Sequence, residues 1–224
     1  MRPAFRSKNE IVYDTLREEI IRGTYKPGTR LVIDELAEVL GVSHIPIREA
    51  MRQLEADGFI TIEPYVGATV TEINANFIFE LFGLLDTLET TCSRSAVRNM
   101  SDSDLQTLAD MIDAMEASLD DPERWSHQNK QLHLFICECA DTFLVLKMMQ
   151  KVLDHWDRLR LHYFKDVLGN RIRSAQQEHR QILEAFLLRD PDEVERVIHE
   201  HNQRGLASYI QHLQATEQTT QSLS

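Results

Sequence analysis

The apolar side chains beyond residue 74 recur at the three- and four-residue spacing of α-helices, and no alternating strand pattern interrupts them. Turn-forming pairs such as Asp121-Pro122 and Asp190-Pro191 divide this region into six segments. The predicted helices are 75–99, 102–119, 123–139, 142–167, 171–188 and 191–213. The polar tail that follows is expected to fray. Six consecutive helices predict an all-α bundle for residues 74–224.

Residues 1–73 follow a different order, in which two helices precede a short turn, a third helix and two strands. The expected elements are helices 9–22, 34–40 and 44–56 and strands 59–63 and 68–72. This order is that of a winged helix-turn-helix, whose third helix projects into the major groove of DNA. We therefore expect a mainly α protein with a DNA-binding domain, residues 1–73, and a separate all-helical domain, residues 74–224.

The third helix carries two faces. Ser43 is its predicted N-cap, and the apolar stripe begins at Ile47 with spacing i, i+3, i+4 and i+7. His44, Arg48 and Arg52 recur every four residues on the opposite face. Arginines in such a position read guanine edges or neutralise phosphates. The alternative is a solvated face, with both arginines paired to neighbouring glutamates, but the complete winged-helix order favours DNA.

The charge and composition limit the other classes of function. The net charge is −12, which argues against a nucleic-acid partner until the chain is divided. Residues 1–73 carry 9 Lys and Arg against 12 Asp and Glu, so most of the acidic excess lies beyond them. No apolar run approaches the roughly 20 residues of a membrane span. The odd count of 3 cysteines favours a reducing compartment over disulfides. We expect a cytoplasmic protein with no membrane contact.

The run LAEVLGVSHIPIREAMRQLEADGFI resembles the DNA-binding domain of GntR-type bacterial transcription regulators. In that family the start of the third helix touches bases and phosphates, and the wing enters the minor groove. The resemblance implies DNA contacts by Ser43, His44, Ile45, Arg48, Arg52 and Gly67. Two departures weaken the positive footprint, because a histidine replaces the family's usual arginine at the second of these positions and the wing lacks a basic residue. Basic side chains near the N-terminus (Arg2, Arg6 and Lys8) are further phosphate contacts or part of a disordered arm.

A second candidate site combines one amide with three imidazoles. Asn129 and His133 are four residues apart and share a helix face, while His179 and His201 lie on the two last helices. Imidazole nitrogens from three helices and one side-chain oxygen suit a divalent transition metal. The alternative is that each histidine is a separate surface or core residue.

Residues 75–213 resemble the FCD effector domain of the FadR-like branch of GntR regulators, and six helices point to its VanR-like subgroup. The resemblance implies a metal held by Asn129, His133, His179 and His201, with zinc first and nickel or manganese as alternatives, and a small organic acid in the same pocket. An asparagine in place of the family's usual aspartate removes one negative charge, which loosens the metal and favours a carboxylate ligand. His155, Arg158 and His162 line this pocket or form a solvated face, and His199 is a surface residue.

These expectations combine into a homodimeric transcription regulator, a repressor, that binds a palindromic operator and responds to a small carboxylate. A direct metal sensor without an organic effector is the first alternative. A metalloenzyme is the second, but such a site needs a carboxylate as ligand or base. We expect none beside the histidines, because Glu178 is predicted to face away from His179. The chain is therefore not expected to be an enzyme.

Overall fold

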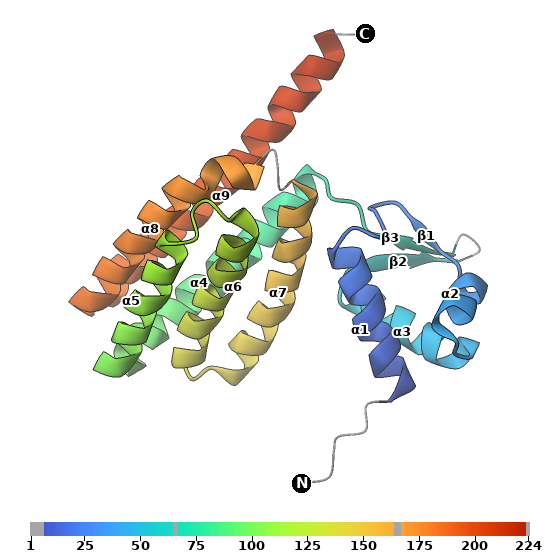
Figure 1. Ribbon diagram of the computed structural model, residues 1–224, viewed down its shortest axis with the longest axis horizontal. Helices are drawn as coiled ribbons and strands as arrows, with labels where there is room; N and C mark the ends of the chain where they lie inside the picture. Colours follow the sequence, from blue (N-terminus) through green and yellow to red (C-terminus); the bar gives the residue numbers. More distant parts are fainter. Residues whose placement is uncertain (1–6, 65–66, 164–166, 223–224) are drawn as a thin grey trace. The chain divides into compact units, whose positions relative to one another are not determined.

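The computed structural model describes residues 7–64, 67–163 and 167–222, which belong to two compact units (Figure 1). The first unit contains the chain up to Asn74 together with Asp157–His162, which is the end of one long helix. The second unit contains Ala75–Trp156 and the chain from Tyr163 onward. Within the described residues, every helix is too short or too polar to span a membrane.

The first unit is a winged helix with a three-stranded antiparallel sheet. Its elements are α1 (Lys8–Ile21), β1 (Arg30–Leu31), α2 (Ile33–Leu40), α3 (His44–Ala56), β2 (Ile60–Glu63) and β3 (Gly67–Val70). Strand β3 lies between the other two, so that Arg30 pairs with Thr69 and Ile62 with Ala68. The two-residue strand β1 is missing from the sequence-based prediction, because it is too short to show an alternating pattern.

Three helices and the sheet enclose one apolar core in this unit. Helix α1 contributes Val12, Leu16 and Ile20, and the predicted stripe of α3 is buried from Ile47 to Leu54. Burying one such aliphatic side chain stabilises a fold by about 1.5–3 kcal/mol. The burial of this stripe fixes the rotation of α3, so its opposite face is turned to solvent.

The second unit consists of six helices within the described residues, as the sequence predicts. They are α4 (Ala75–Asn99), α5 (Asp102–Glu116), α6 (Pro122–Cys139), α7 (Phe143–His162), α8 (Gly169–Leu188) and α9 (Pro191–Ser222). Helix α9 runs past its predicted end at residue 213, because it continues to Ser222 and no Gly or Pro follows Gly205 to end it. Figure 1 shows α9 extending beyond the other helices of its unit.

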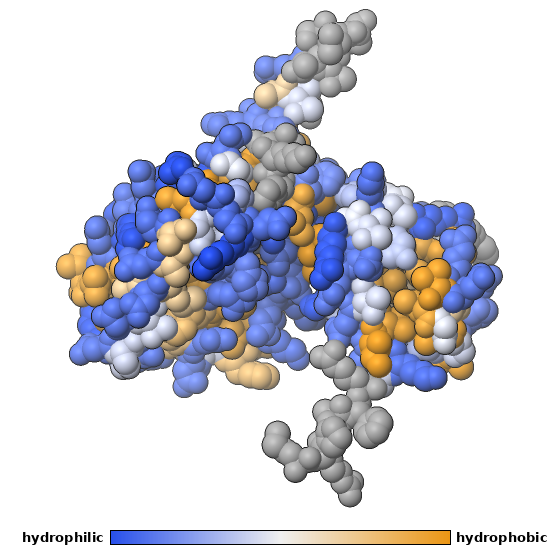
Figure 2. Space-filling view, in the orientation of Figure 1, coloured by the Kyte–Doolittle hydropathy of each residue, from blue (hydrophilic) through white to orange (hydrophobic). Residues whose placement is uncertain are grey.

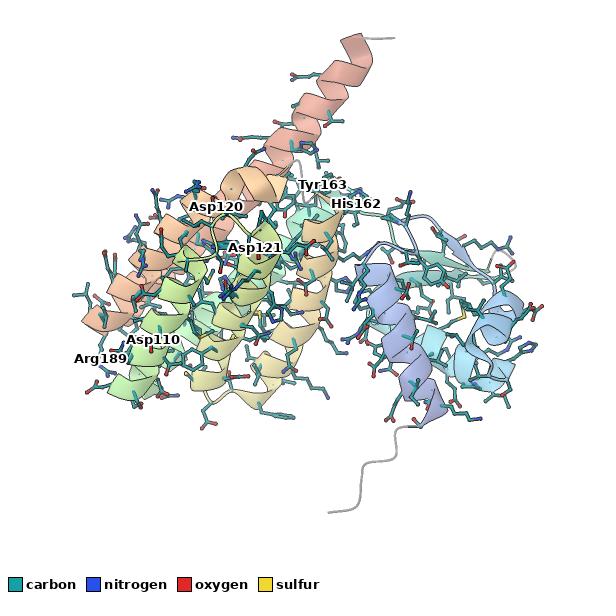
Figure 3. The ribbon with its side chains drawn as sticks, in the orientation of Figure 1. Asp110, Asp120, Asp121, His162, Tyr163 and Arg189 are labelled. Atoms are coloured by element: carbon teal, nitrogen blue, oxygen red, sulfur yellow. A yellow bond between two sulfur atoms is a disulfide. The ribbon has the colours of Figure 1, made fainter. Side chains whose placement is uncertain are left out.

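Local signals in the sequence set where these helices begin. Asp121, labelled in Figure 3, is the N-cap of α6 and accepts a hydrogen bond from the Arg124 amide at 3.1 Å. Ser101 and Asp104 form a capping box at the start of α5. These caps satisfy amides that have no partner within the helix.

Helix α4 packs along α9 and is also joined to α6. A Cβ atom at Gly205 would lie 2.7 Å from the Phe82 ring, so only glycine permits this approach of α9 to α4. Cys92 of α4 and Cys137 of α6 form a disulfide, with Cα atoms 4.9 Å apart. The sequence-based preference against disulfides is therefore wrong in this structure. A separation of 45 residues gives no local signal of their proximity.

Candidate functional site

Three buried histidines meet inside the second unit. His133 of α6, His179 of α8 and His201 of α9 each offer a ring nitrogen, and these nitrogens all lie within 4.8 Å of one another. The rings of His179 and His201 are closest, with centroids 5.0 Å apart. The structure thus brings together three residues that the sequence separates by 68 positions. Three imidazoles at this spacing match the nitrogen ligand set of a transition metal.

Two of the imidazoles are oriented by carboxylates. His133 Nδ1 lies 2.9 Å from Glu89 Oε1, and His201 Nδ1 lies 2.7 Å from Glu178 Oε2. In each ring this contact engages Nδ1 and leaves Nε2 as the ligand atom. Metal-binding histidines typically donate their second N–H to a carboxylate in this way, which fixes the tautomer and the ring orientation.

The third imidazole lacks such a partner. His179 is fully buried, and neither ring nitrogen forms a hydrogen bond within the described residues. The Trp125 ring stacks on it, with centroids 5.6 Å apart and an angle of 23° between the planes. Leaving a buried polar nitrogen without a partner is unfavourable by about 1–3 kcal/mol. A metal ion bound by the three rings would satisfy one of these nitrogens, so the residues fit a metal.

The carboxylates correct the sequence-based expectation. No acidic partner was expected beside the histidines, yet Glu89 is buried, binds His133 and accepts a hydrogen bond from Asn202 Nδ2 at 2.7 Å. Glu178 was expected to face away from the site, yet it contacts His201 and forms a two-bond ion pair with Arg171, at 2.7 and 3.2 Å. Glu89 was missed because it lies on α4, which is remote in sequence from the histidines. The orientation of Glu178 was wrong because α9, which carries His201, packs beside α8.

Burial and neighbouring charges shift the pKa values of Glu89 and of the three histidines. Burial opposes charge on Glu89, but the nearby His133 and the hydrogen bond from Asn202 hold the pKa of Glu89 below its usual range. Burial, reinforced by the neighbouring His201 and His133, lowers the pKa of His179 well below its ordinary value. Burial also lowers the pKa of His201. Burial also opposes charge on His133, but the adjacent Glu89 raises the pKa of this imidazole. His179 and His201 therefore favour the neutral form, which is the form that binds metals.

A cavity of about 570 Å³, its open mouth included, adjoins the histidines. Its polar wall is formed by Glu89, Asn129, His133, Arg171, His201 and Asn202. Asn129 is buried one turn before His133, as their spacing predicts. The rest of the wall is apolar or aromatic and includes the Trp156 and Tyr209 rings.

The other residues suggested for this pocket lie elsewhere. His155, Arg158 and His162 are absent from the cavity wall, so the suggestion that they line it is wrong. The alternative of a solvated face fails for Arg158, which is buried and donates a hydrogen bond to the Thr71 carbonyl. His199 is exposed as predicted, and its Nδ1 lies 2.8 Å from Asp86.

A groove lies beside the third helix of the first unit. Arg48 and Arg52 line it, and within the described part of the chain neither forms an ion pair with a neighbouring glutamate. Their guanidinium groups are therefore available to a ligand. Ile45 is 68% exposed at the start of the same helix.

Two predicted contacts at the start of α3 differ in detail. Ser43 occupies the N-cap position with an extended backbone, but its hydroxyl forms no capping hydrogen bond. The His44 ring lies 3.2 Å from Asp34 of α2, so this imidazole has a carboxylate neighbour at the surface. Lys8 begins α1, whereas Arg2 and Arg6 fall outside the described residues.

Arg30 is a groove residue that the sequence-based reasoning missed. It lies on β1, and its Nε is 3.4 Å from the position of a Cβ atom on Gly67. A guanidinium from β1 thus lies beside the first residue of β3, where the sequence of the wing offers no basic side chain. The residue was missed because β1 itself was missed.

Hydrophobic side chains also reach the surface. Figure 2 shows a largely hydrophilic exterior with separate hydrophobic patches. In the second unit the exposed large apolar residues include Phe79 and Leu84 on α4 and Phe143, Leu144 and Met148 on α7. Leu144 and Met148 are four residues apart on α7 and share a helix face, and exposed apolar side chains of this kind often mark protein interfaces.

The chain matches two known families. Residues 8–70 match the family described as "Bacterial regulatory proteins, gntR family", and residues 80–204 match the FCD domain. The HTH-type transcriptional regulator YdhC of Bacillus subtilis is 28% identical over 177 residues, which is 77% of each chain. The HTH-type transcriptional repressor RspR of Escherichia coli is 25% identical over 197 residues, or 87% of this chain and 86% of RspR.

Solved structures share the fold. The McbR/YncC structure of E. coli has a TM-score of 0.74 at 23% identity and covers 92% of this chain and 99% of its own. A structure described as a metal-free FCD domain has a TM-score of 0.54 at 20% identity and covers 64% of this chain and 99% of its own. The likeness extends over both units in the first case, and the second structure is that of an FCD domain without its metal.

Proposed function

The chain belongs to the gntR family of bacterial regulatory proteins and carries an FCD domain, and from this membership we propose that it is a ligand-responsive repressor. Members of this family are DNA-binding transcription regulators and not enzymes, so the metalloenzyme alternative is set aside. We assign operator binding to residues 1–73 and effector binding and dimerisation to residues 74–224. RspR is a transcriptional repressor by name, and this similarity supports repression rather than activation.

Operator recognition is assigned to the exposed face of α3. Arg48 and Arg52 enter the major groove, where a guanidinium can bind the O6 and N7 atoms of guanine with two hydrogen bonds. Ser43, His44 and Ile45 contact bases or phosphates at the start of this helix. Gly67 brings the wing backbone close to the minor groove. The observation that supports this assignment is that, among the described residues, Arg48 and Arg52 have no ion-pair partner in the groove that they line.

Two copies of the chain bind one palindromic operator. A twofold-symmetric dimer presents two copies of α3 to two half-sites, as helix-turn-helix dimers do. The exposed apolar side chains of α4 and α7 support self-association through the FCD domain, because burying them in a symmetric interface would remove them from water.

Asn129, His133, His179 and His201 are proposed to hold one divalent metal, with zinc preferred over nickel or manganese. Nitrogen ligands in a four-coordinate site are typical of zinc. The buried ring nitrogens of His179 without hydrogen bonds carry this proposal, and the carboxylate-oriented rings of His133 and His201 support it. When bound, the metal supplies a Lewis-acidic position for an oxygen of a carboxylate effector.

Regulation follows from differential binding. An effector shifts the operator affinity only to the extent that it binds one placement of the DNA-binding domains more tightly than the other. Typical couplings of this kind amount to about 1–3 kcal/mol. A direct metal sensor differs because the metal alone would supply this difference. Measuring operator affinity with zinc alone, and then with zinc and an acid, separates the two functions.

The operator assignment is tested by fluorescence anisotropy with promoter fragments from the source genome. Arg48→Ala removes a contact that contributes about 1–3 kcal/mol when it reads a base with two bonds, so affinity should fall about tenfold or more. Arg173→Ala is the matched control, since this exposed arginine pairs with Asp120 in the other unit. Equal affinities of Arg48→Ala and the wild type would refute the assignment of α3.

A further inference from the structure

We propose that the effector is a small monocarboxylic acid with an apolar body, such as an aromatic or branched hydrocarbon, rather than a sugar acid or a dicarboxylate. The proposal rests on the effector-binding role assigned above to the FCD domain and specifies the chemical class that its cavity accepts. Two independent features of the cavity support this proposal: the net charge of its polar residues and the apolar character of the rest of its lining.

The charged groups of the polar wall nearly balance. Glu89 in the wall and Glu178 behind it contribute two negative charges through their contacts with His133 and His201. A divalent ion held by neutral imidazoles offsets both, and Arg171 adds one positive charge. Arg204 also lies 3.8 Å from Glu178, but its charge is balanced by Glu200 at 3.0 Å. The loaded site therefore carries about one positive charge. One carboxylate neutralises it, whereas a dianion would leave an unpaired negative charge in a largely buried site, which is strongly disfavoured.

The rest of the lining is largely hydrocarbon, with the Tyr209 hydroxyl and the Trp156 indole N–H among its polar groups. Helix α4 contributes Phe82 and Leu85, α7 contributes Leu153 and Trp156, and Tyr209 of α9 lies 5.7 Å from Phe82 between ring centroids. Apart from Trp156, which is half-buried, these side chains are almost entirely removed from solvent. They offer an apolar or aromatic ligand a surface on which it leaves water and packs against rings.

A sugar acid fits this wall poorly. Its hydroxyl groups would lose their hydrogen bonds to water on entering and would find few partners among the carbon atoms. The amide side chains of the cavity are Asn129 and Asn202, and that of Asn202 already donates a hydrogen bond to Glu89. A site that leaves hydroxyls unpaired discriminates strongly against the ligand that carries them.

The test is isothermal titration calorimetry with the full chain loaded with zinc. Phenylacetate represents the proposed class, gluconate a sugar acid, succinate a dicarboxylate, and phenylacetamide the uncharged form of the first probe. We expect phenylacetate to bind at least tenfold more tightly than each of the other three. Removing zinc should weaken phenylacetate binding by tenfold or more, because the carboxylate loses its main partner.

Variants of α7 provide the structural control. Trp156→Ala should weaken phenylacetate binding at least fivefold without changing zinc content, which elemental analysis measures. Gln150→Ala changes an exposed polar residue on the same helix and should leave both quantities unchanged. Unchanged phenylacetate binding in Trp156→Ala, with the zinc content of the wild type, overturns the assignment of the apolar wall.

The outcomes also separate this inference from the proposed function. Tighter binding of gluconate or succinate than of phenylacetate overturns the inference, while a change in operator affinity caused by either acid would leave the proposed regulator intact. Failure of all four probes to bind also overturns the inference. A full change in operator affinity with zinc alone would instead overturn the ligand-responsive function and identify a metal sensor.

Discussion

The DNA-facing groove and the histidine cavity use polar residues in opposite ways. In the groove, Arg48 and Arg52 form no ion pair with any residue that the structure describes, so their charges remain available to a polyanion. The cavity buries its polar groups and links most of them, as in the pairs of Glu89 with His133 and Glu178 with His201. Residues of the first kind act through direct contact. Those of the second kind act through one another, so the two sites should respond differently to mutation.

The comparison predicts that the largest single effect lies in the cavity. His179→Ala removes an imidazole that no other side chain replaces, so the metal content of the purified protein should fall from about one ion per chain to nearly none. Elemental analysis of protein purified without chelators gives the measurement. His199→Ala is the matched control, because this exposed imidazole contacts Asp86 outside the cavity. Full metal content in His179→Ala would show that the three rings do not form the ligand set.

The second prediction tests whether a residue without a proposed metal bond still governs the metal. Glu89→Gln keeps the shape of the side chain but removes the charge that orients His133. Loss of such a carboxylate partner typically weakens metal affinity about 10–100-fold. Competition for zinc with a chromogenic chelator measures the change. Glu80→Gln, an exposed position on the same helix, should have no effect. If the two variants retain equal affinity, the carboxylate is only a structural partner of the histidine.

The sequence predicts the groove along α3 better than the histidine cavity, because the groove depends on a local pattern and the cavity on packing between helices. The stripe of α3 from Ile47 to Leu54 is a local pattern, and the helix, its buried face and its exposed arginines are recovered from it. The histidines of the cavity are recovered as candidates because their spacing and the family resemblance name them. Their carboxylates were not, because proximity between α4 and α6 or between α8 and α9 depends on packing that no local pattern encodes.

One signal for Glu89 was nevertheless present. It lies four residues after Leu85 in the buried stripe of α4, where an acidic side chain interrupts an otherwise apolar face. A buried carboxylate requires a charged or hydrogen-bonding partner, so its position alone indicates a polar site inside the bundle. Arg30 gave no comparable signal, because β1 has only two residues and its inward position is a single leucine.

The third prediction returns to the groove and concerns Arg30. If this guanidinium beside Gly67 contacts a phosphate, Arg30→Ala should weaken binding to operator and unrelated DNA by a similar factor, a few-fold at moderate salt. The dependence of log affinity on log salt should fall by about one unit. Arg22→Ala is the control, since this exposed arginine is near Glu18 of α1. Loss of operator binding alone would instead indicate base recognition by Arg30.

The smallest expected effect concerns the cysteines, which belong to neither site. Burial and the nearby Asp104 and Glu138 carboxylates raise the pKa of Cys139 to about 11. Its thiolate fraction at pH 8 is therefore about 100-fold lower than that of a thiol with the reference value of 9.0. Alkylation of the native protein by iodoacetamide should be correspondingly slow and should leave operator binding unchanged.

Mass spectrometry under denaturing conditions checks the same assignment. Without a reductant, one cysteine should react rapidly, since Cys92 and Cys137 are joined. After reduction all three should react, because unfolding removes the burial that protects Cys139. Rapid alkylation of Cys139 in the native protein would show that its thiol is more accessible or more acidic than its surroundings indicate. Labelling of three residues before reduction would show that α4 and α6 are held together by packing alone.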